Sequence, residues 1–238
     1  MGTTHLPEYL PTTQDIRETF ADEVASLGGG IPDVYNDGQR LFARAVLPAD
    51  TEVRPGDHIR AGVAVRASGT ELLVHPYTFR QICSNGAIAT HALHGRRLER
   101  IQSSGIFDAT YDEDVALMDL RLAVRACAAK DAFDTAAQEM RSAAEVEADF
   151  ALQVLPALAA MPERLAARLV PQIFHRFTTG GDRSAFGLLN AVTSVARDTR
   201  HPEMRWRLET VGGTIPSRLG PQPRTLRPVH AAAVLVGV

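Results

Sequence analysis

The chain has 238 residues, of which 45% are hydrophobic and 22% charged, and its formal net charge at pH 7 is −3. This composition is typical of globular proteins and excludes disordered, collagen-like and purely coiled-coil chains. A chain of this length fits one generous domain or two small ones and buries roughly 70% of its unfolded surface. Two cysteines, Cys83 and Cys127, are too few for a disulfide scaffold.

Charge is distributed unevenly along the chain. Residues 1–38 carry 1 basic and 7 acidic residues, residues 39–102 carry 9 and 5, residues 103–165 carry 5 and 12, and residues 166–238 carry 10 and 4. Lys130 is the single lysine, so arginine supplies the rest of the positive charge. Arginine binds phosphates and carboxylates through paired hydrogen bonds and stacks on flat rings.

No targeting or membrane signal is visible. The first residues lack the basic and apolar regions of a signal peptide. The longest apolar run, residues 231–238, has 8 residues, far fewer than the roughly 20 that span a bilayer. We therefore expect a cytoplasmic protein that does not contact membranes.

The spacing of apolar residues predicts a helix over residues 11–27, capped by Thr12 or Thr13. The glycine-rich run at residues 28–33 ends it. A phosphate-binding loop would be followed by lysine and Ser or Thr, which are absent here, so we interpret this run as a plain loop.

Three strand-like runs follow, at residues 40–47, 58–66 and 71–75. Side chains alternate between the faces of a strand, so the second run has one apolar face and one basic face.

A helix over residues 77–84 is predicted next, because Pro76 suits a first helical turn and Asn85–Gly86 suits a C-terminal cap. Residues 40–86 thus form a β-β-β-α unit. Residues 87–101 are predicted to return as a hairpin around His94–Gly95.

Helices dominate from Asp112 onward. A seam of residues three or four apart predicts one long amphipathic helix over residues 112–145. The seam comprises Val115, Met118, Leu122, Ala126, Ala129, Phe133, Ala136 and Met140. Ser184 is expected to cap a helix over residues 185–197, and a last short helix lies near residues 203–211.

The predicted fold class is therefore α+β, a β-β-β-α core with a small antiparallel sheet and a helical C-terminal half. We expect a single domain over residues 1–212, sheet-rich in 39–102 and helical in 112–212. Residues 213–238 are predicted to form a mobile tail.

Three stretches carry a family resemblance: RLFARAVLP at residues 40–48, PGDHIRAGVAVRASGTELLVHPYTFRQICSNGAI at residues 55–88, and SAFGLLNAVTSVARD at residues 184–198. Together they resemble the bacterial and phage family called domain of unknown function 932, the phage/plasmid-like proteins. The likeness covers about residues 15–212, although the turn at residues 67–69 departs from the longer acidic turn more frequent in that family. The family has no established activity, so the resemblance implies a fold and a mobile-element context rather than a mechanism.

Arginines of the predicted sheet form the first candidate site. Several arginines on one rigid face can neutralise several phosphates at once, and Tyr77 and Phe79 lie near enough in sequence to stack on bases. The candidate nucleic-acid-binding residues are Arg44, Arg60, Arg66, Arg80, Arg96, Arg97 and Tyr77, with Arg100 beside them. The alternative is a solvated face that pairs with acidic residues of the 103–165 segment.

The β-β-β-α order is similar to the core of single-strand-annealing recombination proteins, which form rings and often travel on phages. We therefore predict a homo-oligomeric nucleic-acid-binding protein of phage or plasmid type that binds single strands, with annealing in recombination or replication as a candidate role and no cofactor. The alternative is an oligomeric scaffold that associates through residues 112–145. A metal-dependent hydrolase is a third reading.

Metal and nucleophile signals are weak. Cys83, His91 and His94 lie within 12 residues, with His58 and His75 nearby in sequence, but zinc needs three or four converging ligands. Cys83 and Ser184 belong to no protease signature. We therefore predict no catalytic residue and no metal site.

Asn190 and Thr193 interrupt an otherwise apolar helical pattern. A buried amide without a partner is costly. Two roles remain open: a structural hydrogen bond to the turn at residues 178–184, or contact with a ligand.

Overall fold

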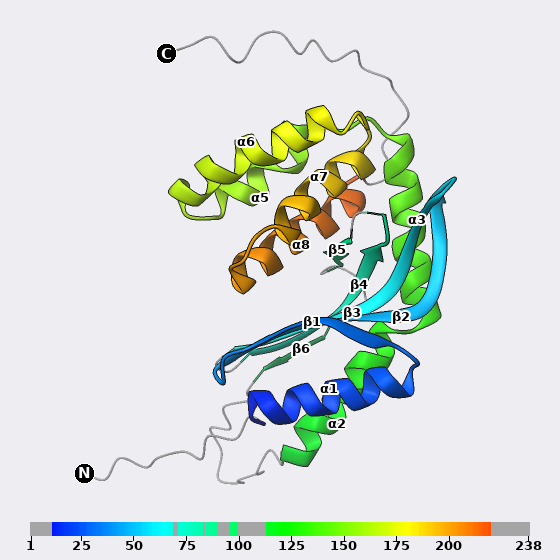
Figure 1. The fold of residues 1–238 in the computed structure, drawn as a ribbon, viewed down its shortest axis with the longest axis vertical. Coiled ribbons are helices and arrows are strands. Elements are labelled where there is room, and N and C mark those ends of the chain that lie inside the picture. Colours follow the sequence, from blue (N-terminus) through cyan, green and yellow to red (C-terminus); the bar gives the residue numbers. More distant parts are fainter. Residues whose placement is uncertain (1–10, 69–70, 83, 90–95, 100–112, 220–238) are drawn as a thin grey trace, which may run out of the picture.

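The computed structural model describes residues 11–68, 71–82, 84–89, 96–99 and 113–219. A six-stranded antiparallel sheet has the order β1-β2-β3-β4-β5, with β6 also paired to β4. Helices cover both faces of the sheet (Figure 1). The predicted α+β class, with most helices in the C-terminal half, is confirmed.

The bounds of the elements follow in chain order. The strands are β1 (Gly30–Asn36), β2 (Arg40–Arg54), β3 (Asp57–Ser68), β4 (Glu71–Arg80), β5 (Asn85–Ile88) and β6 (Arg96–Glu99). The helices are α1 (Thr13–Ser26), α2 (Glu113–Cys127), α3 (Lys130–Glu145), α4 (Phe150–Gln153), α5 (Leu155–Ala159), α6 (Glu163–Thr179), α7 (Ala185–Arg197) and α8 (Pro202–Ser217).

The first helix forms as predicted. The Thr12 hydroxyl accepts a hydrogen bond from the Asp15 backbone N–H at 3.2 Å, and the Asp15 carboxylate accepts one from the Thr12 N–H at 3.1 Å. This reciprocal arrangement satisfies two donors at the helix start. Ile16 and Phe20 of α1 are buried against the sheet.

The interpretation of residues 28–33 as a plain loop is wrong from Gly30 onward, where β1 begins. The chain turns at Gly28, whose φ is +72°, and then enters β1, which pairs with β2. A side chain at Gly29 would stand 2.6 Å from the Leu47 side chain, so the absence of a Cβ lets this turn pack closely on β2.

The predicted helix over residues 77–84 is wrong, because β4 continues through Pro76 to Arg80. The Pro76 carbonyl accepts a hydrogen bond from the Ala89 N–H at 3.0 Å. The nitrogen and the carbonyl of one strand residue point to the same neighbouring strand. The nitrogen of Pro76 therefore faces β5, like its carbonyl, just beyond the last β4–β5 pair, Tyr77 with Ile88. The β3–β4 ladder therefore loses no hydrogen bond to this proline.

The interpretation of Asn85–Gly86 as a helix cap is wrong for the same reason. Both residues belong to β5, and the positive φ of this turn falls on Ser84, at 49°. A Cβ on Gly86 would stand 2.2 Å from the Tyr77 ring, so the glycine makes room for that aromatic side chain. The predicted hairpin over residues 87–101 is also wrong, because β5 and β6 both pair with β4.

The predicted long helix over residues 112–145 is two helices. Ala129 has φ −61° and ψ 145°, an extended conformation that separates α2 from α3. The seam holds in α3, where Phe133 and Met140 are buried. It is wrong in α2, where Met118 and Leu122 are 57% and 58% exposed.

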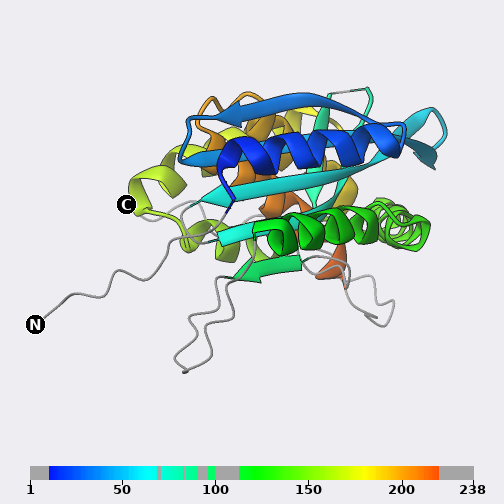
Figure 2. The same cartoon turned by 90° about the horizontal axis from the view of Figure 1, so that it is seen from below.

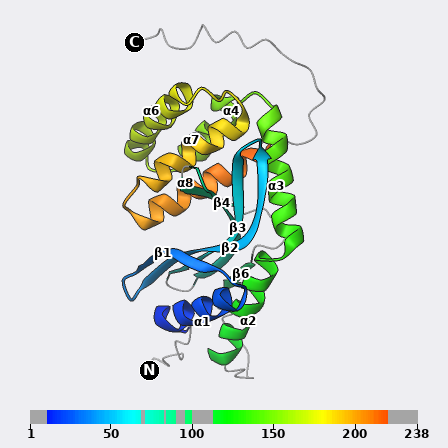
Figure 3. The same cartoon turned by 45° about the vertical axis from the view of Figure 1, so that its right-hand side comes forward.

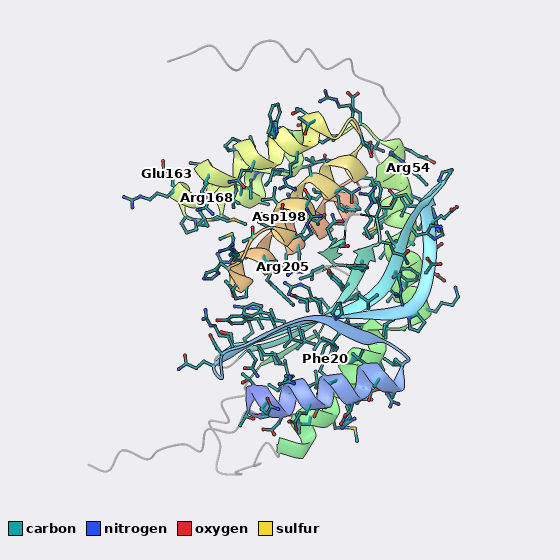
Figure 4. The ribbon with its side chains drawn as sticks, in the orientation of Figure 1. Phe20, Arg54, Glu163, Arg168, Asp198 and Arg205 are labelled. Carbon is teal, nitrogen blue, oxygen red and sulfur yellow. The ribbon has the colours of Figure 1, made fainter. Side chains whose placement is uncertain are left out.

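Both faces of the sheet are covered. On one face Val63 and Val65 of β3 belong to the same core cluster as Phe20 of α1, which is labelled in Figure 4. Helices α1 and α2 pack against each other on this face, below the sheet in Figure 1 and in front of it in Figure 2. On the other face Phe42 and Tyr77 pack with Trp206 of α8. Figure 3 shows α6, α7 and α8 together on the side away from α1 and α2.

The C-terminal helices extend further than the sequence pattern indicated. Ser184 caps α7 as predicted, accepting from the Gly187 N–H at 3.1 Å. Helix α8 continues to Ser217, past the predicted domain end at 212, while residues 220–238 of the predicted tail lie outside the described residues. None of the helices in the described ranges combines the length and apolar character that crossing a membrane requires.

Candidate functional site

Arg44 is buried rather than available on a surface. Its side chain is 3% exposed; its Nε donates to Glu209 at 2.7 Å and its Nη1 to Asp33 at 2.7 Å. Arg205 of α8 binds the same two carboxylates, both at 3.1 Å. Two arginines and two carboxylates, with no net charge, therefore join β1, β2 and α8. Burial raises the pKa of the Glu209 carboxyl, although the two arginines act to lower it.

The other strand arginines also bind partners within the fold. Arg60 donates from Nε and Nη2 to the Leu47 carbonyl at 3.0 and 2.8 Å. Arg66 pairs with Glu71 and, at 3.1 Å, with Glu203 of α8. The charge of Arg66 is therefore neutralised within the fold, whereas Arg60 binds a neutral carbonyl and forms no ion pair with the described residues.

Arg80 holds the Asp57 carboxylate through two hydrogen bonds of 2.7 and 2.6 Å. It pairs in the β3–β4 register with Ile59, on the face opposite to that of Arg60. Tyr77, proposed to stack on bases, is 3% exposed, and burial raises the pKa of its hydroxyl. The side chains of Arg96 and Arg97, and all of Arg100, lie outside what the structure describes.

The predicted basic face thus exists, and α8 covers it at Arg44 and Arg66. Arg44, Arg60 and Arg66 share a side of the sheet, as the alternation predicted. Helix α8 lies over that side and supplies Glu203 and Glu209. The carboxylates that meet these arginines come from outside the 103–165 segment that the sequence alternative named.

A concave surface lies elsewhere, between α6, α7 and the start of α8. This arginine groove has a volume of about 560 Å³. It is lined by Leu165, Arg168, Leu169, Gln172, Arg176, Val195, Asp198, Thr199, Arg200, His201 and Met204. Its α6 residues recur at helical spacing, so one face of that helix forms a wall.

The rim of the arginine groove is basic. Three arginines, Arg168, Arg176 and Arg200, line the groove together with one carboxylate, Asp198. Asp198 accepts from Arg197 at 2.9 Å and from Arg176 at 2.5 Å, and these bonds hold the pKa of its carboxyl below the ordinary value. Arg168 and Arg200 form no ion pair with any residue in the described part of the chain.

A second hollow of about 250 Å³ adjoins the first along the sequence from Asp198 to Arg200, which lines both. Its far wall is β1 together with Arg205, which reaches from α8 towards the sheet (Figure 4). Arg197, Arg200 and Arg205 line this hollow together with Asp33 and Asp198. Arg197 pairs with Asp198 and Arg205 with Asp33 and Glu209, whereas Arg200 forms no ion pair with the described residues.

Asn190 and Thr193 lie at a small cavity of about 10 Å³ between β5 and α7. The Asn85 amide donates to the Thr193 hydroxyl, which in turn donates to the Leu189 carbonyl at 3.0 Å. The Oδ1 atoms of Asn85 and Asn190 are buried without a partner among the described residues. Thr193 therefore has a structural role, while the turn at residues 178–184 gives Asn190 Oδ1 no hydrogen bond.

The metal and nucleophile candidates gain no support. Cys83, His91 and His94 lie outside the described residues. The described part of the chain holds no group of three or more histidine, cysteine or carboxylate side chains arranged to bind a metal. Ser184 caps α7 and also donates to Asp182 at 2.7 Å.

Sequence reasoning missed Arg168, Arg176 and Arg200. The signal was present in the 10 basic and 4 acidic residues of the 166–238 segment, and in the recurrence of residues 165, 168, 169, 172 and 176 on one helical face. The spatial meeting of α6 with the α7–α8 connection was not visible in that pattern.

Comparison with known proteins adds no assignment. No protein family, curated protein or solved structure matches the chain. The resemblance to the phage/plasmid-like proteins stays a prediction.

Proposed function

We propose that the protein binds single-stranded nucleic acid through the arginine groove. The observation that carries this proposal is the pair Arg168 and Arg200, two exposed arginines on a concave rim that form no ion pair within the described chain. Guanidinium groups without a carboxylate partner can bind phosphate oxygens directly.

The extent of the two adjoining concave surfaces favours a polymeric ligand over an isolated anion. The arginine groove and the hollow beside it meet at Arg200. The lining of the hollow holds four arginines against two carboxylates, Asp33 and Asp198, although Arg197 and Arg205 are engaged in ion pairs. A phosphate backbone carries regularly repeated charge, so a series of arginines along a channel can neutralise several phosphates of one strand. This site replaces the covered sheet face as the location of binding.

Salt-dependent binding of labelled single strands tests the proposal. For single strands the log–log slope of affinity against salt is roughly −0.7 per neutralised phosphate. The double substitution Arg168→Ala/Arg200→Ala removes two such contacts, so we expect the slope to shrink by roughly 1.4 and binding to weaken for all sequences alike.

Arg164→Ala is the matched control, because Arg164 is an exposed arginine one turn earlier on α6 that does not line the groove. It should change the slope little. Wild-type protein that fails to bind a roughly 40-nucleotide strand at low salt, where backbone contacts are strongest, would refute the proposal. Equal slopes for the wild type and the double variant would refute this location.

An oligomeric scaffold is the second candidate, and one observation favours it. Met118 and Leu122, one turn apart on α2, are 57% and 58% exposed. Adjacent apolar side chains on a helix surface are a common feature of association sites. Sedimentation of the wild type and of Met118→Lys/Leu122→Lys tests this candidate, which predicts a smaller species for the variant.

A further inference from the structure

The floor of the arginine groove is apolar, which phosphate binding alone does not require. Leu165 and Leu169 of α6, Val195 of α7 and Met204 of α8 contribute this floor. Leu169 and Val195 are each 3% exposed, while Leu165 and Met204 are half-buried and reachable from the groove. The volume of about 560 Å³ lies within the range of pockets that enclose small organic groups.

A neutral polar side chain also lines the arginine groove. Gln172 lines the groove and is exposed, and its side chain makes no hydrogen bond with the described residues. A free amide offers both donors and an acceptor in one plane. The groove therefore offers apolar side chains for the ring of a nucleotide, a neutral amide for the edge of its base and arginines for its phosphate.

We infer that the arginine groove takes one unpaired base of the bound strand, with its ring on the floor formed by Leu165, Leu169, Val195 and Met204. This inference rests on the proposed function and specifies its ligand. The phosphates on either side of the inserted base lie at Arg168 and Arg200. A base within a duplex is stacked and paired, so it reaches such a floor only after it leaves the stack.

The inference predicts that bases add to the affinity that the phosphates provide. A strand without bases measures the phosphate contribution alone. The probes are a roughly 40-nucleotide oligothymidine, whose bases stack weakly on one another, and an abasic strand with the same number of phosphates. Burial of roughly 60 Å² of apolar base surface, at about 25 cal/mol per Å², strengthens binding by about tenfold. We expect wild-type protein to bind oligothymidine about tenfold tighter than the abasic strand, with equal salt slopes for both.

Filling the floor should remove this preference. Leu165→Trp replaces a branched aliphatic side chain by a bulky indole ring that fills the groove, and it removes no arginine. Ala167→Trp is the matched control, because Ala167 is exposed on the same helix and does not line the groove. We expect Leu165→Trp to bind both strands alike and Ala167→Trp to keep the wild-type preference.

The outcomes distinguish the inference from the function on which it rests. Wild-type protein that binds both strands equally, with steep salt dependence, would overturn the inserted base and leave nucleic-acid binding intact. Binding of neither strand would overturn the proposed function. The wild-type comparison needs no variant, so it decides the question even if Leu165→Trp does not fold.

Discussion

Gly213→Ala tests the contact that joins the last helix to the sheet. Gly213 lies in α8, and a Cβ built there would stand 2.0 Å from the carbonyl oxygen of Ile88 in β5. Carbon and oxygen atoms in close contact are about 3.3 Å apart, so α8 and β5 would have to separate by about 1.3 Å. The obstacle is backbone, which cannot turn aside as a flexible side chain would.

Two opposing effects set the size of the change. Alanine favours a helix over glycine by about 1 kcal/mol. Overpacking of a close contact costs about 1–3 kcal/mol, and a clash with backbone places this site at the upper end. We therefore expect Gly213→Ala to lower the free energy of unfolding by about 2 kcal/mol.

Urea unfolding followed by tryptophan fluorescence measures this change. Trp206, the single tryptophan of the chain, lies in α8 and is 5% exposed, so its emission reports on the same helix. Gly30→Ala is the control, because a Cβ there meets nothing within 4 Å. A Gly213→Ala protein as stable as the wild type, or more stable, would refute the close approach of α8 to β5.

Three further predictions concern the core and its charges. Phe133→Ala should lower the free energy of unfolding by about 3–5 kcal/mol in urea titrations, because this ring is 8% exposed; a near-neutral result would mean that α3 does not pack there. Arg44→Met should cost about 3–5 kcal/mol, since it leaves Glu209 buried with Arg205 alone, and adding Glu209→Leu should recover part of the loss; two additive losses would contradict the network. Arg125 holds the pKa of buried Glu23 below its ordinary value of 4.5, so this carboxylate contributes stability above that pH and loses it as the pH falls through the lowered pKa. The stability difference between wild type and Glu23→Gln should therefore shrink between about pH 6 and about pH 3 in thermal melts, and a constant difference would exclude the ion pair as its source.

Local patterns predicted the elements whose stability is local. Thr12 and Ser184 cap the helices that follow them, and the two faces of β3 alternate as the sequence indicated. The same reasoning failed at Pro76 and Asn85–Gly86. Proline fits the end of a strand ladder as well as the start of a helix, and glycine fits a close contact within a sheet as well as the end of a helix. Strand pairing decided between these readings, and pairing is not a local property.

The candidate site was less predictable than the fold. The arginines of the sheet do share a side, but nothing near Arg44 or Arg66 in sequence indicates that α8 covers them with Glu209 and Glu203. The arginine groove depends on how α6 meets the α7–α8 connection, which a one-dimensional charge pattern does not specify. The excess of basic residues in the 166–238 segment indicated where positive charge lies in the sequence, but not that these residues form a groove.

The buried pair of Arg44 and Glu209 spans 165 residues of sequence. During synthesis β2 to β4 leave the ribosome well before α8, so Phe42, Arg44 and Tyr77 stay open to water, or to other chains, until the last described helix arrives. Contacts of such separation slow folding and lengthen the exposure of apolar surface. We therefore expect chains that end before Pro202 to bind chaperones. We also expect proteases to degrade them under conditions in which the full-length protein is not cleaved.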